Sequence, residues 1–223
     1  MRVLVVCAHP DDEVLGAAGT LARHARAGDD VTVAILATGV LSRQGDPATL
    51  ARALARLRED AGRANASIGV QELLLGDLED QKLDTLPMLD VARVVEGHLE
   101  RVRPEVVYTN HYGDLNADHV VTYRAVLTAA RPRPDLSVRR ILAFEVASST
   151  EWNVPYRFAP TVFVDVTQTI EAKFAAMALY TGETRDFPHP RSREALLAIS
   201  QRWGSVAGMR NAEAFELVRE LER

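Results

Sequence analysis

The fold is decided by the stretch Arg2-Val3-Leu4-Val5-Val6-Cys7-Ala8-His9-Pro10-Asp11-Asp12-Glu13, in which an apolar run passes directly into a polar cluster. Residues 2–8 are mostly β-branched or aliphatic and do not alternate with polar residues, which is typical of a strand buried on both faces of a parallel sheet. Residues 13–27 then repeat apolar side chains at intervals of three and four, and Gly28 follows as a stop signal. The opening of the chain therefore predicts a buried strand followed by a helix.

The same alternation continues to the end of the chain. Strands that alternate with helices predict an α/β protein, a Rossmann-like three-layer sandwich with a mostly parallel central sheet. We find no internal repeat and no linker, so residues 1–223 are expected to form a single domain. Further strands are expected at 31–37, 72–75, 105–109, 139–145 and 161–166. Further helices are expected at 47–66, 86–102, 117–130 (capped by Asn116), 168–181, 191–203 and 211–221.

Composition argues against several classes of protein. The 223 residues are 47% apolar, and 26 Lys and Arg against 31 Asp and Glu leave a net charge of −5, which argues against nucleic acid as the main partner. Cys7 is the single cysteine, so we expect a small buried side chain rather than a disulfide or a cysteine metal cluster. There is no run of about 18 apolar residues, and the first apolar run is too short for a signal peptide. We therefore expect a cytoplasmic protein without a membrane span.

The polar cluster after the first strand has the side chains of a metal site. His9 and Asp12 offer an imidazole nitrogen and a carboxylate oxygen three residues apart on a tight turn, a spacing that can chelate one cation. A catalytic zinc usually has about three protein ligands and an open position, so a third ligand must come from elsewhere. The strand at 105–109 is also followed by a polar segment, and strands distant in sequence are readily adjacent in a parallel sheet. We predict His119 as the third ligand, with His111 as the second choice.

Asp11 is then the carboxylate left beside the open position of the metal. A metal-bound water is acidified toward neutrality, and a carboxylate within hydrogen-bond reach can take its proton and deliver it to a leaving amine. We therefore predict metal-assisted hydrolysis with Asp11 as the general base, in preference to a role as helix N-cap. For Glu13 we favour a structural role in the first helical turn, where a carboxylate interacts well with the helix dipole.

The stretch Ala8-His9-Pro10-Asp11-Asp12-Glu13, together with the distant pair Asp118-His119, resembles the LmbE-like, or PIG-L, family of zinc-dependent N-acetyl-sugar deacetylases. The resemblance extends over nearly the whole chain. It continues in Arg58-Glu59, Leu78-Glu79-Asp80-Gln81-Lys82-Leu83-Asp84, Phe187-Pro188-His189-Pro190-Arg191-Ser192, Arg202-Trp203-Gly204-Ser205 and Ala212-Glu213-Ala214-Phe215.

This resemblance implies an enzyme that removes the N-acetyl group from an N-acetylglucosamine-type amino sugar or its conjugate and releases acetate. It implies zinc, or another divalent ion such as Fe²⁺, on His9, Asp12 and His119. It also implies Asp11 as the general base and Asp118 as a residue that orients a histidine ligand. Trimers and hexamers occur among the proteins that this chain resembles, so the resemblance also suggests a homo-oligomer.

One motif departs from the family pattern. Many members read His-Pro-Asp-His, and the first histidine of that motif acts on the developing oxyanion, whereas this chain reads Asn116-Ala117-Asp118-His119. Asn116 can donate a hydrogen bond but supplies neither a proton nor a positive charge. We hypothesise that His111 or His189 fills this role from another loop.

The resemblance also suggests residues that contact substrate, and two other functions stay open. The candidate contacts are Arg58, Asp80, Asn116 and Glu145, while Trp152 either stacks on a sugar ring or packs at the edge of the core. One alternative is a non-catalytic, metal-dependent sugar-binding protein that has lost the acid at Asn116. The other is a hydrolase of a different bond such as a phosphoester, which would usually need two metals about 4 Å apart and more carboxylate ligands than we can place.

Overall fold

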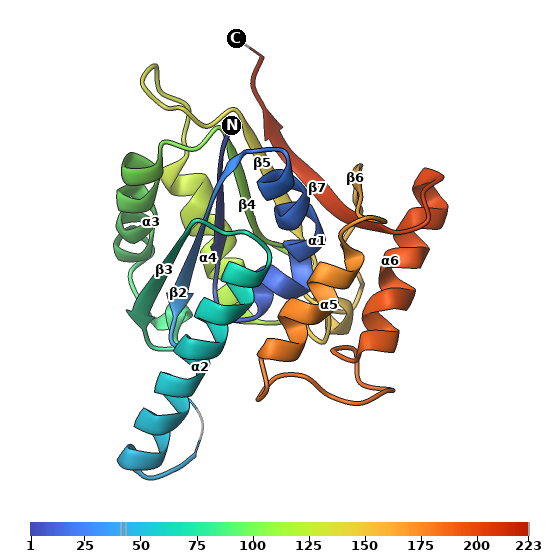
Figure 1. The fold of residues 1–223 in the computed structure, drawn as a ribbon. Coiled ribbons are helices and arrows are strands. Elements are labelled where there is room, and N and C mark those ends of the chain that lie inside the picture. Colours follow the sequence, from blue (N-terminus) through green and yellow to red (C-terminus); the bar gives the residue numbers. More distant parts are fainter. Residues whose placement is uncertain (41, 43, 223) are drawn as a thin grey trace.

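A central seven-stranded sheet runs through the protein in the computed structural model, which describes residues 1–40, 42 and 44–222 (Figure 1). The strand order is β3-β2-β1-β4-β5-β7-β6. The strands are β1 (Arg2–Cys7), β2 (Asp30–Ala37), β3 (Glu72–Leu78), β4 (Val106–Asn110), β5 (Arg140–Phe144), β6 (Val162–Asp165) and β7 (Ala212–Glu220). The α-helices are α1 (Asp12–Arg26), α2 (Pro47–Ser67), α3 (Met88–Val102), α4 (Ala117–Ala129), α5 (Ile170–Leu179) and α6 (Arg193–Ala207). Two short 3₁₀ helices are η1 (Leu83–Thr85) and η2 (Thr150–Trp152).

The first five strands are parallel, and β7 runs antiparallel to both of its neighbours, β5 and β6. The prediction of an α/β fold with a mostly parallel central sheet is therefore confirmed. Helices cover both faces: α3 and α4 lie on one face, and α1, α2 and α5 lie on the other (Figure 1). No helix in the described part of the chain combines the length and the apolar character needed to cross a membrane.

β1 lies in the middle of this sheet and is buried on both faces, as its sequence predicts. Val3, Val5 and Cys7 pack with α1, α2 and α5 in one half of the core, while Leu4 and Val6 pack with α3 and α4 in the other half. Cys7 is fully buried, which confirms the expectation for the single cysteine.

One predicted element is wrong. The segment 211–221, expected to be a helix, forms strand β7. Alanine, glutamate and leucine are good helix formers, which explains the prediction. In the folded protein, however, this segment lies between β5 and β6 and pairs with both strands through backbone hydrogen bonds. The side chain of Phe215 is fully buried there. Tertiary pairing of this kind overrides local propensity.

Candidate metal centre

The metal-site residues lie where two neighbouring parallel strands end. β1 pairs with β4, with Val6 opposite Thr109, so the segments that follow both strands leave the sheet at the same edge. Asn110, the last residue of β4, joins these segments: its Oδ1 accepts a hydrogen bond from the backbone N–H of Ala8 (3.0 Å), and its Nδ2 donates to Asp12 (3.1 Å). The loop after β1, the start of α1 and the end of β4 are thereby held side by side.

His9, Asp12 and His119 converge at this edge. The Nδ1 atom of His9 lies 3.2 Å from Nε2 of His119, and Asp12 Oδ1 lies 3.3 Å from the same Nε2 atom. The three groups can each offer one ligand atom with all of these atoms within 4.8 Å of one another, and all three side chains are buried. The predicted set of three candidate ligands is therefore brought together, and the first choice, His119, is the histidine that completes it.

Each histidine of this cluster has a carboxylate behind it. Nε2 of His9 lies 2.9 Å from Asp118 Oδ2, and Nδ1 of His119 lies 3.1 Å from Asp114 Oδ2. Such carboxylates hold a proton on the outer nitrogen of an imidazole and leave the lone pair on the inner nitrogen. The inner nitrogens, His9 Nδ1 and His119 Nε2, are the two atoms that face each other.

Two nitrogen lone pairs and a carboxylate oxygen at this separation repel one another unless a cation or a proton lies between them. Burial lowers the pKa of His119, but the carboxylates of Asp12 and Asp114 outweigh it and raise this pKa to about 10. The cluster therefore retains a proton where no cation is bound. A set of two imidazole nitrogens and one carboxylate is suited to Zn²⁺ and also to Fe²⁺, so the residues fit a divalent transition metal.

Asp11 stands beside this cluster in an uncommon backbone conformation. Its φ is 93°, in the left-handed region, and its side chain makes no capping hydrogen bond to α1 although it occupies the N-cap position. The carboxylate instead accepts a hydrogen bond from Arg191 Nη1 (2.6 Å), and the same guanidinium bonds Glu183 Oε2 (3.0 Å) and Ser148 Oγ (2.8 Å). Burial raises the pKa of Asp11, and the Arg191 cation opposes that rise. Arg191 thus favours the ionised carboxylate in a buried position.

Glu13 lies in the first turn of α1, as expected, but it is fully buried and bonded to two other segments and to the residue that precedes α1. Its Oε1 accepts hydrogen bonds from Tyr180 Oη (2.6 Å) and Asn65 Nδ2 (2.9 Å), and its Oε2 accepts one from the backbone N–H of Asp11 (3.1 Å). Burial raises its pKa to about 7 despite these bonds. Glu13 therefore has a structural role, as expected, and it accepts a hydrogen bond that helps to hold the Asp11 backbone.

A cavity of about 210 Å³, called the inner cavity here, opens onto these groups. Asp80 lines it and accepts hydrogen bonds from Ser42 Oγ (2.5 Å) and Thr38 Oγ1 (3.1 Å). Asn116 lines it too, and its Oδ1 caps α4 by accepting from the backbone N–H of Asp118 (2.9 Å), which confirms the predicted N-cap. The remaining polar lining comes from His9, Asp11, Asp12, Gln81, His119, Ser148, Ser149, Glu183 and Arg191.

Three of the predicted site residues that do not line the inner cavity are held by partners elsewhere. Arg58 lies on α2 and bonds Asp77 and the carbonyl oxygen of Gly76. Glu145 is held away from the metal cluster, because its carboxylate accepts hydrogen bonds from Trp203 Nε1 (2.5 Å) and Tyr156 Oη (2.7 Å). His111 is buried with its Nδ1 accepting from the backbone N–H of Gly113 (3.0 Å) and its Nε2 lying 2.9 Å from Glu216 Oε1. Arg58 and Glu145 were suggested as substrate contacts and His111 was predicted from a polar segment at a strand end, and all three have structural partners instead.

His189 lies in an adjoining cavity that shares part of its wall with the inner cavity. Several residues of the site were not predicted as individual candidates, and the two that contact predicted ones most directly are Asp114 behind His119 and Arg191 on Asp11. Both lie in segments that the sequence singled out, since Asp114 is in the polar run after the fourth strand and Arg191 follows His189-Pro190. Two signals could have identified them. A histidine that binds a metal is usually accompanied by a carboxylate, and a buried carboxylate that acts as a base needs a cation beside it.

The comparisons with known proteins agree with this arrangement. The family model described as PIG-L, GlcNAc-PI de-N-acetylase, matches residues 4–130, which is more than half of the chain. The chain therefore belongs to the PIG-L family, as its motifs indicated. The matched residues include most of β1, all of β4 and all three members of the His9, Asp12 and His119 cluster.

Three known proteins illustrate the range of relatives. The 1D-myo-inositol 2-acetamido-2-deoxy-alpha-D-glucopyranoside deacetylase of Nakamurella multipartita is 33% identical over 175 residues, which cover 64% of this chain and 58%, less than two thirds, of that protein. The diacetylchitobiose deacetylase of Thermococcus kodakarensis is 25% identical over 97% of this chain and 83% of its own length. The crystal structure of GalB, a 4-carboxy-2-hydroxymuconate hydratase from Pseudomonas putida, has a TM-score of 0.80 and 25% identity over 100% of this chain and 99% of that one.

Proposed function

We propose that this protein is a metal-dependent deacetylase that hydrolyses the acetamide of an N-acetylglucosamine-type amino sugar or its conjugate. One observation carries the proposal: a cluster of two imidazoles and one carboxylate, backed by two further carboxylates, shares a cavity with the carboxyl group of Asp11, which Arg191 contacts. Membership of the PIG-L family and deacetylases among the relatives support the same reaction and the same class of substrate.

His9, Asp12 and His119 would hold the metal, and a bound divalent cation supplies Lewis-acid chemistry, polarising a carbonyl and making water more acidic. Asp118 and Asp114 keep the two imidazoles oriented with their lone pairs inward. Asp11 accepts the proton of the attacking water on its carboxylate, which Arg191 favours in the ionised form. The same carboxyl group then returns a proton to the leaving amine, so that acetate and a free amino sugar are released.

Asn116 provides a neutral hydrogen-bond donor in the wall of the inner cavity. Its Oδ1 is occupied by the cap of α4, so its Nδ2 is the group left to donate toward an oxyanion that develops in the reaction. This arrangement would make charge stabilisation depend on the metal more than in relatives with a histidine at this position. The hypothesis that His111 supplies a cation here finds no support in its contacts, whereas His189 stays a candidate from the adjoining cavity.

The test is acetate release from N-acetylglucosamine, its methyl glycoside, N,N′-diacetylchitobiose and N-acetylglucosaminyl-inositol, with the metal content of the protein measured in parallel. We expect release by the purified enzyme, loss of activity after dialysis against a chelator, and recovery on addition of Zn²⁺ or Fe²⁺. Acetate release that survives complete removal of metal would overturn the metal-dependent mechanism. Amino-sugar binding without acetate release would instead support a sugar-binding protein.

Hydration of a carbon–carbon double bond is the second candidate function. It is favoured by the likeness to GalB over the full chain, and the guanidinium of Arg191 in the cavity wall is a group that binds substrate carboxylates. The two functions are separated by their products. A hydratase would consume an unsaturated acid, seen as a loss of its ultraviolet absorbance, and would release no acetate from any of the four sugars.

A further inference from the structure

A second cavity of about 340 Å³ adjoins the inner cavity and holds none of the three candidate metal ligands. We call it the outer cavity. Three residues, Ser148, Glu183 and Arg191, line both cavities, so the outer cavity begins at the wall that carries the partner of Asp11. Its remaining lining consists of Trp152, Arg185, His189 and Pro190. A substrate larger than one amino sugar would extend naturally from the metal cluster into this space.

Several polar groups in the wall of the outer cavity can form a further hydrogen bond, and these groups are donors. Nδ1 of His189 accepts a hydrogen bond from the backbone N–H of Arg191 (3.1 Å), which places the imidazole proton on Nε2. Ser148 Oγ accepts from Arg191 Nε (2.8 Å), so its hydroxyl hydrogen is directed to another acceptor. The acceptor in the wall, Glu183, is bonded to Arg191.

Arg185 adds a positive charge to this set of donors. Its Nη1 atom bonds the carbonyl oxygens of Gly182 and Thr184, each at 2.8 Å, and no carboxylate lies within ion-pair distance of it among the residues that the structure describes. The Nη2 and Nε atoms carry three further N–H groups that can donate by the chemistry of the guanidinium. A guanidinium fork matches the paired oxygens of a carboxylate or phosphate.

Trp152 supplies an apolar wall. It ends η2 and is 63% exposed, although a tryptophan ring carries one of the largest apolar surfaces of any side chain. An exposed aromatic ring in the wall of a cavity is suited to stacking against a sugar or cyclitol ring. Trp152 lines the outer cavity and is largely exposed, so its side chain is not packed at the edge of the core. This position favours the other interpretation, in which Trp152 stacks on a sugar ring.

We propose that the outer cavity binds the part of the substrate attached to the amino sugar, and that it selects a group bearing a carboxylate or a phosphate. Arg185, His189 and Ser148 provide the donors for the anionic oxygens, and Trp152 contacts the ring or chain that carries them. This inference rests on the proposed deacetylase function, since it concerns selection among substrates of that reaction. Arg191 bonds both Asp11 and Glu183, so its cation offsets part of the negative charge that the two carboxylates place at the shared wall of the two cavities.

The experiment compares kcat/KM for three substrates that share the reacting acetamide: methyl N-acetylglucosaminide, N-acetylglucosamine 1-phosphate and N-acetylglucosaminyl malate. We expect the enzyme to favour one or both anionic substrates by about tenfold or more, and to lose that preference in Arg185→Gln through a higher KM. Comparison of kcat/KM between the phosphate-bearing and the carboxylate-bearing substrate shows which anion the enzyme prefers. Because exposed charges are screened by salt, the preference should also shrink as ionic strength rises.

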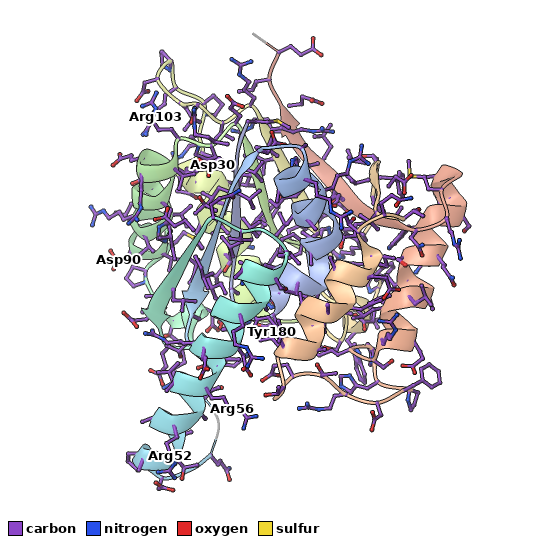
Figure 2. All side chains as sticks on the ribbon, in the orientation of Figure 1. Asp30, Arg52, Arg56, Asp90, Arg103 and Tyr180 are labelled. Atoms are coloured by element: carbon purple, nitrogen blue, oxygen red, sulfur yellow. The ribbon has the colours of Figure 1, made fainter. Side chains whose placement is uncertain are left out.

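Matched variants make the result specific. Arg52→Gln removes an exposed guanidinium at the projecting end of α2, far from the sheet (Figure 2), and should leave all three substrates unchanged. Trp152→Ala should raise KM for every substrate with a bulky aglycone, whereas Leu89→Ala, a change at an exposed residue of α3, should not. Equal kcat/KM for neutral and anionic substrates, or a preference that survives Arg185→Gln, would overturn the inference. Acetate release from the methyl glycoside reports on the proposed function separately.

Discussion

Residues 1–130 and residues 131–222 contribute different groups to the same cavity. The first region is a series of parallel β-α units and supplies the three candidate metal ligands, both carboxylates behind the histidines, and Asp11. The second region contains the antiparallel strands β6 and β7 and supplies Ser148, Ser149, Glu183 and Arg191. The family model matches only the first region.

The two regions supply groups with different proposed tasks: one set holds the cation, and the other set contacts the rest of the substrate. Groups that must hold a cation come from loops locked between two central strands, where Asn110 and Asp12 fix the geometry. Groups that meet the rest of a substrate come from longer connections around η2 and between α5 and α6. The first region is therefore expected to determine whether the reaction occurs, and the second to determine on which substrate.

The largest effect is expected at Asp12. Asp12→Ala removes the carboxylate that lies against both histidines and leaves their lone pairs facing each other without a third ligand. We expect loss of bound metal and of detectable acetate release, measured by elemental analysis and a product assay. Metal retained at the wild-type ratio would show that the cluster is not the metal site and would break the division between the two regions.

Asp11→Asn separates metal binding from proton transfer within the first region. The side chain keeps its size but can no longer accept a proton, and the three ligands stay in place. We expect wild-type metal content with kcat lower by roughly 10²–10⁴-fold, the usual contribution of a general base. An active variant with normal metal content would rule out Asp11 as the base.

The carboxylates behind the histidines should affect metal affinity more than proton transfer. Asp118→Asn and Asp114→Asn each replace an acceptor that orients one imidazole. We expect metal affinity to fall about 10–100-fold, measured by competition with a chelating dye, with activity restored at high metal concentration. Failure of excess metal to restore activity would assign these residues a role in the reaction itself.

Arg191→Gln tests whether the second region also acts on the chemistry. Loss of one charge-assisted hydrogen bond, worth about 1.5 kcal/mol, is expected to lower kcat about tenfold with metal content unchanged. Because the Arg191 cation opposes the rise in the pKa of Asp11, its removal raises that pKa further, and the base then ionises only at higher pH. The acidic limb of the pH–kcat/KM profile should therefore move to higher pH, whereas an unmoved limb would limit Arg191 to substrate contacts.

The smallest effect on activity is expected from a buried ion pair that stabilises the second region. Lys173 Nζ lies 2.7 Å from Glu213 Oε1, both side chains are buried, and Glu213 also accepts the backbone N–H groups of Gly19 and Thr20 in α1. Lys173→Met leaves a buried carboxylate unpaired and should cost roughly 3–5 kcal/mol in urea unfolding. Glu171→Gln, which breaks the exposed pair with Arg193, should cost about 0–1 kcal/mol. Equal losses would show that the buried pair is dispensable.

The sequence predicted the first region well because its signals are local. A continuous apolar strand, a polar turn and a helical repeat occur within residues 2–27, and the rule that ligands meet at the carboxyl edge of a parallel sheet then places His9 near His119. The observed β-α units follow the predicted ranges closely, with β3 extending to Leu78 rather than ending at residue 75.

The second region depends on contacts that no local pattern contains. β7 has helix-forming residues and becomes a strand because it pairs with β5 and β6. Arg191 is 180 residues away from Asp11, and its place in the cavity depends on how the connection after α5 crosses the sheet edge. Glu145 and Arg58 occupied promising positions in sequence, but their hydrogen-bond partners hold them elsewhere.

The left-handed backbone of Asp11 has a consequence for engineering. A non-glycine residue in this region costs roughly 1–3 kcal/mol, and glycine adopts it readily. The Asp11 carboxylate is also buried near Asp12, Glu13 and Glu183, which repel it. A library screened only for heat resistance would therefore enrich Asp11→Gly, and its most stable members would be inactive. Directed evolution of this protein has to screen for turnover alongside thermal tolerance, because the two requirements oppose each other at this residue.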